Sequence, residues 1–362
     1  MISLARRVVA NRTAAALALA LGAAVVIIAA AGQNPAEALS AMLAGAIGDF
    51  PAAIRSTIET GQPVLPNEAL RSLAKATPLL LSGLAVALAL RAGLFNIGAE
   101  GQILVGGFAA AIVGGNLAGL PNWIHLPLAL AAACTCGAAW AAIAGWLKAW
   151  RGTHEVIVTI MLNYVAIQLT HYLVNGPARD PASLAPATRL VQPSARLWAL
   201  EGGTNFSAGF LIALVAAAGY ALLFARYRLG FEIRAVGANS DAARASGIAI
   251  GRTMVVAMAF SGALAGLAGA IEVLGVHRRY LDAFSPGYGF DSIAVALLGN
   301  LHAGGIIASA CLFGGISSGA VHMEAFTHTP RQIAGVIQAV IILAVAARAY
   351  GQWRSRRTEA PR

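Results

Sequence analysis

A succession of long apolar stretches, separated by short polar segments, constrains this chain more than any other feature of its sequence. The stretches cover approximately residues 13–31, 74–90, 97–118, 126–147, 156–174, 207–225, 253–274, 290–300, 304–322 and 332–348. A helix needs roughly 20 mainly apolar residues to cross the core of a bilayer, and most of the stretches approach that length. Charged residues make up only 11% of the chain, whereas about a quarter are charged in a soluble domain. The sequence therefore predicts an all-α polytopic membrane protein with about ten transmembrane helices, built as a single transmembrane domain over residues 1–362.

The distribution of charge predicts the orientation of the chain. When the N-terminus is placed in the cytoplasm, most Arg and Lys residues fall in inside segments, for example Arg6, Arg7 and Arg12 before the first stretch, and acidic residues gather outside. This is the positive-inside distribution of membrane proteins. It explains the net charge of +10 without a nucleic acid or other polyanionic partner, and it places both termini in the cytoplasm. The first stretch is expected to be a retained helix rather than a cleaved signal peptide.

The polar segments have distinct expected roles. Residues 32–72 carry a mild helical pattern and are expected outside, lying on the membrane. Residues 175–206 contain several prolines and glycines and predict an irregular external loop. Residues 226–252 form the longest inside loop, and residues 349–362 form a cytoplasmic tail.

Small residues and cysteines are expected to serve packing. The pairs Gly115/Gly119, Gly262/Gly266 and Gly315/Gly319 have the small-xxx-small spacing that lets membrane helices approach closely. The three cysteines, Cys134, Cys136 and Cys311, lie in apolar stretches, and no Cys/His spacing typical of a metal site surrounds them. No metal and no cofactor is therefore expected.

Two apolar regions are interrupted by glycines at comparable places in the two halves of the chain, at 91–101 and at 290–305. Such paired breaks indicate a solute site formed by half-helices near the middle of the membrane. The first break holds Asn96, Glu100 and Gln102, and buried polar groups are expensive in a bilayer. Glu100 either caps the free amides of a half-helix or contacts the solute, and the same alternatives apply to Asp291. A lining of amide groups suits a neutral, hydrogen-bonding solute better than an ion.

The loop at 231–248 predicts a compact element of two short helices. Asn239 or Ser240 can cap the second helix, Asp241 suits its first turn, and Gly247 can end it. Regular capping and alanine-rich faces favour a rigid element that docks into a groove of a partner protein.

Four segments together resemble the permease subunits of bacterial ABC importers of the branched-chain amino acid and simple-sugar group, and are most similar to the subfamily for nucleosides and simple sugars. In order along the chain, they are LRAGLFNIGAEGQILVGG, HEVIVTIMLNY at 154–164, FEIRAVGANSDAARASGI and YGFDSIAVALLGNLHAGG at 288–305. The resemblance extends over about 75–345.

The resemblance implies a vitamin-B12-type importer architecture with an inverted repeat, in a bacterial inner membrane. It implies a translocation path near both breaks, formed by Phe95, Asn96, Glu100, Gln102, Asn163, Phe290, Asp291 and Asn300. It also implies a coupling element for a nucleotide-binding subunit, formed by Glu232, Arg234, Gly237, Asn239, Ala242, Ala243 and Gly247. The expected partners are an ATP-binding cassette ATPase, a second permease subunit that is identical or homologous, and an extracytoplasmic solute-binding protein. The solute favoured is a nucleoside, with a simple sugar next.

Two other classes of protein compete with this one. A secondary transporter driven by protons or sodium would need a chain of membrane acids, and Glu100, Glu272 and Asp291 are few and scattered. The secondary ion-coupled transporter of a small solute is kept as the alternative. A membrane enzyme would need paired acidic motifs, a Ser/His set or a metal set within the spans, and none is visible. The chain also lacks a GxxxxGK[ST] phosphate-binding loop, so the expectation is a transport subunit whose ATP is hydrolysed by another chain.

Overall fold

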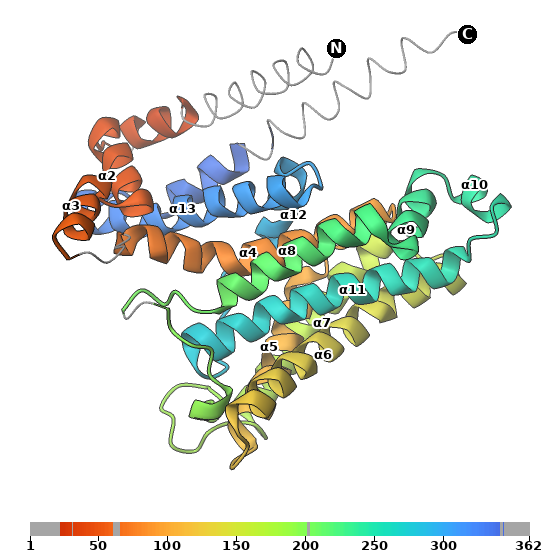
Figure 1. Cartoon of the computed structure of the whole chain (residues 1–362). Helices are drawn as coiled ribbons and strands as arrows, with labels where there is room; N and C mark the ends of the chain where they lie inside the picture. The colour runs from red at the N-terminus through yellow and green to blue at the C-terminus, as the bar shows by residue number, and fades with distance from the viewer. Residues whose placement is uncertain (1–21, 31, 61–65, 201–202, 341–342, 344–362) are drawn as a thin grey trace, which may run out of the picture. The chain divides into compact units, whose positions relative to one another are not determined.

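The computed structural model describes residues 22–30, 32–60, 66–200, 203–340 and 343, and this part of the chain is built from helices without any named strand (Figure 1). It divides into two compact units. The first comprises Met1–Ser72 with Leu312–Arg362, and the second comprises Leu73–Cys311. The predicted cytoplasmic tail at 349–362 lies outside the described residues.

The first unit contains the segment predicted to lie on the membrane. It forms α2 (Pro35–Ile47) and α3 (Phe50–Thr60), and Asn34 caps α2 by accepting a hydrogen bond from the Ala36 amide. Helix α2 packs on the C-terminal half of α13 (Ala303–Thr327), where the Ser318 hydroxyl donates to the Gly45 carbonyl at 3.3 Å. The mild helical pattern of this segment therefore correctly predicted helices.

Six helices are long and apolar enough to cross a membrane within the described part of the chain. They are α4 (Asn67–Arg91), α6 (Asn122–Arg151), α7 (Glu155–Asn175), α8 (Gly209–Arg226), the helix Ile250–His277, and α13. Helix α5 (Ala99–Asn116) coincides with the stretch predicted at 97–118 but carries polar residues at both ends. Of the first and last predicted stretches, the structure describes residues 22–30 and 332–340 as helical, with residue 343 beyond them. The prediction of an all-α polytopic membrane protein is confirmed.

Helix α6 shows how these helices fit a bilayer. It has 30 residues, a length of about 45 Å at 1.5 Å per residue. Trp123 near its start is 76% exposed, and Trp146 and Trp150 near its end are 47% and 61% exposed. Tryptophans gather at the two interfaces of a membrane. Their separation along α6, about 35–40 Å, matches a hydrocarbon core of about 30 Å with part of each headgroup region.

The core of the second unit is a close contact of α5 and α6 with α11 (Ile250–Ile271), and long helices of this unit run side by side in Figure 1. A side chain at Gly262 or Gly266 would overlap the α6 backbone at Gly137 or Ala133. Backbones that approach this closely replace the packing that larger side chains would supply. The prediction for Gly262/Gly266 is confirmed. That for Gly115/Gly119 is wrong, because Gly119 lies in a turn with nothing near its Cβ position.

Candidate functional site

The first predicted break is present as a non-helical link between α4, which ends at Arg91, and α5, which begins at Ala99. Asn96 is fully buried in this link and Gln102 is 1% exposed. Each of their side-chain amides donates to the oxygen of the other at 3.0 Å. Asn96 also donates to the Ser261 hydroxyl of α11 at 2.8 Å and accepts from the Gly98 amide. These groups therefore satisfy one another, as buried polar groups in a bilayer must.

Asn163 of α7 fastens the break to its neighbour. Its Oδ1 accepts from the Gly101 amide at 2.8 Å, and its Nδ2 donates to the Ile97 carbonyl at 2.9 Å. One side chain thus satisfies the backbone on both sides of the helix start. Since Asn163 follows the first residue of α7, Glu155, by eight positions, α5 begins about 12 Å along α7 from the N-terminal end of that helix.

The second break is a half-helix. Helix α12 (Tyr288–Leu298) has 11 residues, about 16 Å, and cannot cross a membrane alone. Its Gly289 amide donates to Oε2 of Glu100 at 2.7 Å, and Glu100 is only 5% exposed. The first amides of a helix have no partner within it. The structure therefore shows Glu100 as a cap on α12, one of the two roles that the sequence left open for it.

The segment between α11 and α12 leads the chain to the start of the half-helix. Helix α11 continues into a π-helical turn, η2 (Glu272–His277), and the following loop folds back against α5. Tyr280 is 1% exposed there, with its ring 5.5 Å from that of Phe108 and 5.0 Å from that of Phe284. The aromatic cluster thus fixes the loop before α12 against α5.

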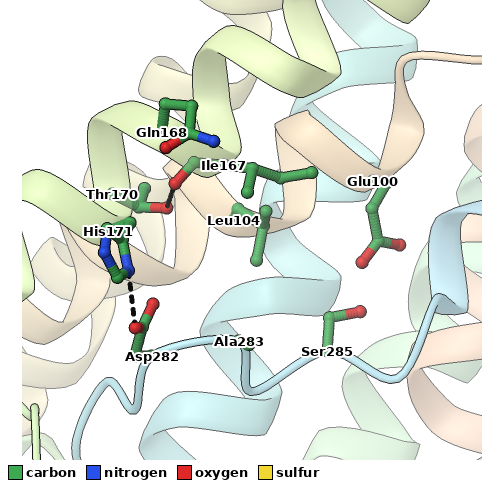
Figure 2. A pocket seen from close by; sticks show the side chains of 9 residues that line it. All are labelled: Glu100, Leu104, Ile167, Gln168, Thr170, His171, Asp282, Ala283 and Ser285. Atoms are coloured by element: carbon green, nitrogen blue, oxygen red, sulfur yellow. Dashed lines mark hydrogen bonds and ion pairs between the residues drawn. The ribbon is translucent and has the colours of Figure 1, made fainter.

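A cavity of about 330 Å³ opens beside the Glu100 cap. Figure 2 shows polar groups at both of its ends, with Glu100 and Ser285 at one and His171 and Asp282 at the other. At the second end, Nδ1 of His171 lies 2.7 Å from Oδ2 of Asp282. The apolar side chains of Leu104 and Ile167 lie between the two ends, and Gln168, Thr170 and Ala283 complete the lining.

Of the residues predicted to lie near the solute path, Glu100 alone lines this cavity. Asn96, Gln102 and Asn163 hold the first break together instead. Phe95 and Asp291 are half-buried, whereas Phe290 is 47% exposed and Asn300 is exposed in the turn that follows α12. Sequence reasoning missed His171, Asp282 and Ser285. The irregular segment before α12 could have indicated Asp282 and Ser285, because both residues lie in it.

The predicted coupling element consists of α9 (Arg228–Ala238) and α10 (Ser240–Ala245). Asn239 separates the helices and caps α10 by accepting from the amides of Asp241 and Ala242. Gly247 follows α10 with a φ of 78°, as expected of the residue that ends it. Gly237 belongs to the last turn of α9.

The side chains of this element divide between its two faces. Arg234 and Ala242 are exposed, whereas Ala243 is 3% exposed and faces inward. Glu232 forms an ion pair with Arg228 at 2.7 Å. A partner protein could therefore contact Arg234 and Ala242 directly, while Ala243 supports the element from within.

The fold and the two breaks define a multi-pass helical membrane protein with a half-helix capped inside it. Comparison with known proteins gives the family. Residues 69–346 match the family described as the permease component of the branched-chain amino acid transport system. The chain belongs to this family.

Curated relatives agree with this assignment. The chain is 40% identical to the guanosine ABC transporter permease of Bacillus subtilis, with 91% of each chain covered. It is 37% identical to the glucose ABC transporter permease of Haloferax volcanii, over 75% of this chain and 74% of the relative. With the nucleoside ABC transporter permease of Lactococcus lactis it shares 34% identity, over 74% and 76%. The chain is a membrane-spanning permease subunit of an ATP-binding cassette importer, and the resemblance read from its four segments is confirmed.

Proposed function

We propose that this permease subunit moves a neutral nucleoside across the membrane, with a simple sugar as the second candidate. The observation that carries the proposal is the cavity beside Glu100. It has hydrogen-bonding groups at both ends and apolar side chains between them, and its volume is at the lower end of the range for small-molecule sites. A nucleoside has matching chemistry, because its base and its ribose carry polar groups at opposite ends and the base has apolar faces. A hexose shares the hydroxyl groups but has a smaller apolar surface.

The charge of the cavity favours a neutral solute over an anion. Its described lining holds two carboxyl groups, from Glu100 and Asp282, and no Arg or Lys. Carboxyl oxygens accept hydrogen bonds from hydroxyl and amino groups, and the described lining offers no Arg or Lys to neutralise a phosphate group. The names of the relatives, for guanosine, nucleosides and glucose, fit this preference.

The whole chain is proposed to have about ten transmembrane helices in a vitamin-B12-type importer architecture, with an inverted repeat that brings the two breaks together. The contact between Glu100 and Gly289 supports such a pairing of the halves. Both termini are placed in the cytoplasm of a bacterial cell with the 226–252 loop, because basic residues concentrate in that loop and in the segments beside it. Residues 32–72 and 175–206 are then external.

The partners follow from the transport mechanism. The ATPase subunit is proposed to dock on α9 and α10, with contact residues drawn from Glu232, Arg234, Gly237, Asn239, Ala242, Ala243 and Gly247. An identical or homologous second permease completes the path, and an extracytoplasmic binding protein delivers the solute to the outer loops. ATP is hydrolysed on the partner, and this chain is proposed to have no catalytic activity.

Uptake by the complete importer in proteoliposomes tests the solute. Radiolabelled guanosine is offered with an excess of unlabelled guanosine, glucose or guanosine monophosphate. We expect competition by guanosine, weaker competition by glucose, and none by the monophosphate. Stronger competition by glucose would make a sugar the solute, and competition by the monophosphate would contradict the role given to the carboxyl groups of the cavity.

A further inference from the structure

The turn between α12 and α13 has a backbone that needs support. Asn300 and Leu301 have φ values of 51° and 58°. These values lie in the left-handed region, which residues other than glycine seldom occupy. Two successive residues keep this left-handed conformation, when one of them is leucine, only if the surrounding structure holds them in place.

Two side chains from other helices supply that support through one atom, the Leu301 carbonyl oxygen. Arg91, the last residue of α4, donates to it from Nη2 at 2.7 Å and from Nε at 3.1 Å. The Tyr220 hydroxyl of α8 donates to it at 2.8 Å. The Arg91 Nε also lies 2.9 Å from the Tyr220 hydroxyl, and the guanidinium lies 4.6 Å from the centre of the Phe224 ring. We call Arg91, Tyr220 and the Leu301 carbonyl the turn clamp.

The backbone of Arg91 is in turn covered by α9. A Cβ at Gly237 would overlap the Arg91 carbonyl oxygen and would lie 2.8 Å from the Gly93 amide. Gly93 itself has a φ of 73° and meets Gly237 backbone to backbone. Helix α9 is therefore in direct contact with the residue whose side chain holds the turn.

We propose that Arg91 is the positioning residue that transmits movement of α9 to the half-helix α12, with Tyr220 as its co-donor. This inference rests on the proposed docking of the ATPase on α9 and α10. A push or pull on α9 acts on the Arg91 backbone through Gly237. The guanidinium carries the displacement to the α12–α13 turn, because a planar group with two donors on one carbonyl resists sliding better than a single contact.

The experiment uses the complete importer in nanodiscs, with its ATPase and its binding protein. The clamp variants are Arg91→Gln and Tyr220→Phe. The second removes only the hydroxyl and leaves the ring packed against Phe224. The matched controls are Arg151→Gln, an exposed arginine at the end of α6, and Tyr164→Phe, a tyrosine that is 62% exposed on α7.

Two measurements separate transmission from folding. The first is the ratio of solute-stimulated to unstimulated ATP hydrolysis. The second is the response to nucleotide of a spin label at His302, beside the turn, compared with a label at Asp241 on α10. In the clamp variants we expect the stimulation ratio to fall about fivefold or more, the scale of typical coupling between sites, and the His302 response to be lost while the Asp241 response remains. Arg91→Lys, which keeps the positive charge and one donor nitrogen but loses the planar two-nitrogen contact, is expected to restore part of the stimulation.

Each other outcome has a defined meaning. Clamp variants that keep the parental stimulation and the His302 response would overturn the proposal for Arg91 while leaving the importer function intact. A parental complex whose Asp241 label does not respond to nucleotide would instead overturn the proposed docking on α9 and α10. Loss of both label responses in Arg91→Gln and in Tyr220→Phe, with the controls normal, would assign the clamp to holding α9 in place and would also overturn transmission.

Discussion

Replacement of Glu100 tests whether its carboxyl group caps the half-helix. In Glu100→Ala, the buried Gly289 amide loses the oxygen that accepts from it at 2.7 Å. A buried donor left without its partner costs about 1–3 kcal/mol, and Glu100 is only 5% exposed. Glu100→Gln keeps a carbonyl oxygen on a side chain of the same length. We expect it to lose less than about 1 kcal/mol, since a neutral acceptor replaces a carboxyl oxygen in the same place.

The assay is unfolding of the purified permease by SDS in mixed micelles, which yields a free energy of unfolding for each variant. Glu324→Ala is the matched control, because this carboxyl group is 43% exposed and lies 3.8 Å from Arg331, a geometry worth at most about 1 kcal/mol. The expected order is parental and Glu324→Ala most stable, Glu100→Gln close behind, and Glu100→Ala lowest. A parental free energy of unfolding in Glu100→Ala would refute the capping role.

The same variants distinguish capping from solute contact. If Glu100 serves chiefly as a cap, Glu100→Gln retains most of the uptake rate and the same half-saturating solute concentration. A large rise in that concentration in Glu100→Gln, without loss of stability, would show that the carboxyl group is needed by the solute instead.

Three further substitutions test the contact of α9 with α4, the contact of α11 with α6, and the solute site. Gly237→Ala should lower solute-stimulated ATP hydrolysis severalfold, because its Cβ overlaps the end of α4. The control Gly219→Ala, whose Cβ meets nothing within 4 Å, should leave this stimulation unchanged. Equal effects of the two substitutions would contradict the contact between α9 and α4. Gly266→Leu should cost about 1–3 kcal/mol by overpacking α11 against α6, read as a lower thermal midpoint in detergent, and an unchanged midpoint would contradict the helix contact. Asp282→Ala should change stability by about 1 kcal/mol or less, since its carboxyl is 29% exposed, but raise the half-saturating solute concentration of uptake; an unchanged concentration would remove Asp282 from the solute site.

The parts of the fold that depend on local pattern were accessible from the sequence. Length and hydropathy placed α4, α6, α7, α8 and α13, because a membrane span is a property of one continuous segment. The capping residues of α10 were equally local, and Asn239 and Gly247 occupy the expected positions. The glycine interruptions at comparable places in the two halves of the chain indicated both breaks.

The walls of the cavity were not accessible in the same way. Asn96, Gln102 and Asn163 are conspicuous in the sequence because they are polar in apolar surroundings, and the same burial makes them bond to one another and to the broken backbone. These three residues therefore stand out because the non-helical backbone at the break needs hydrogen-bond partners. His171 and Asp282 are separated by 111 positions, and only the fold-back of the loop before α12 brings them together. A pairing of this kind has no period or spacing that a single sequence can display.

The half-helix α12 is held at both of its ends by one short segment of the chain. Glu100 binds its first turn, and Arg91 binds the turn that follows its last residue. The two anchors are only nine positions apart, and the break between them is fixed to α7 by Asn163 and to α9 through Gly237. Residues 91–102 and α12 are therefore expected to move as one body when α9 is displaced. Asn163 holds the same segment to α7, and His171 of α7 lies at the other end of the cavity from Glu100, so the two polar ends are expected to keep their separation for as long as the Asn163 bonds remain.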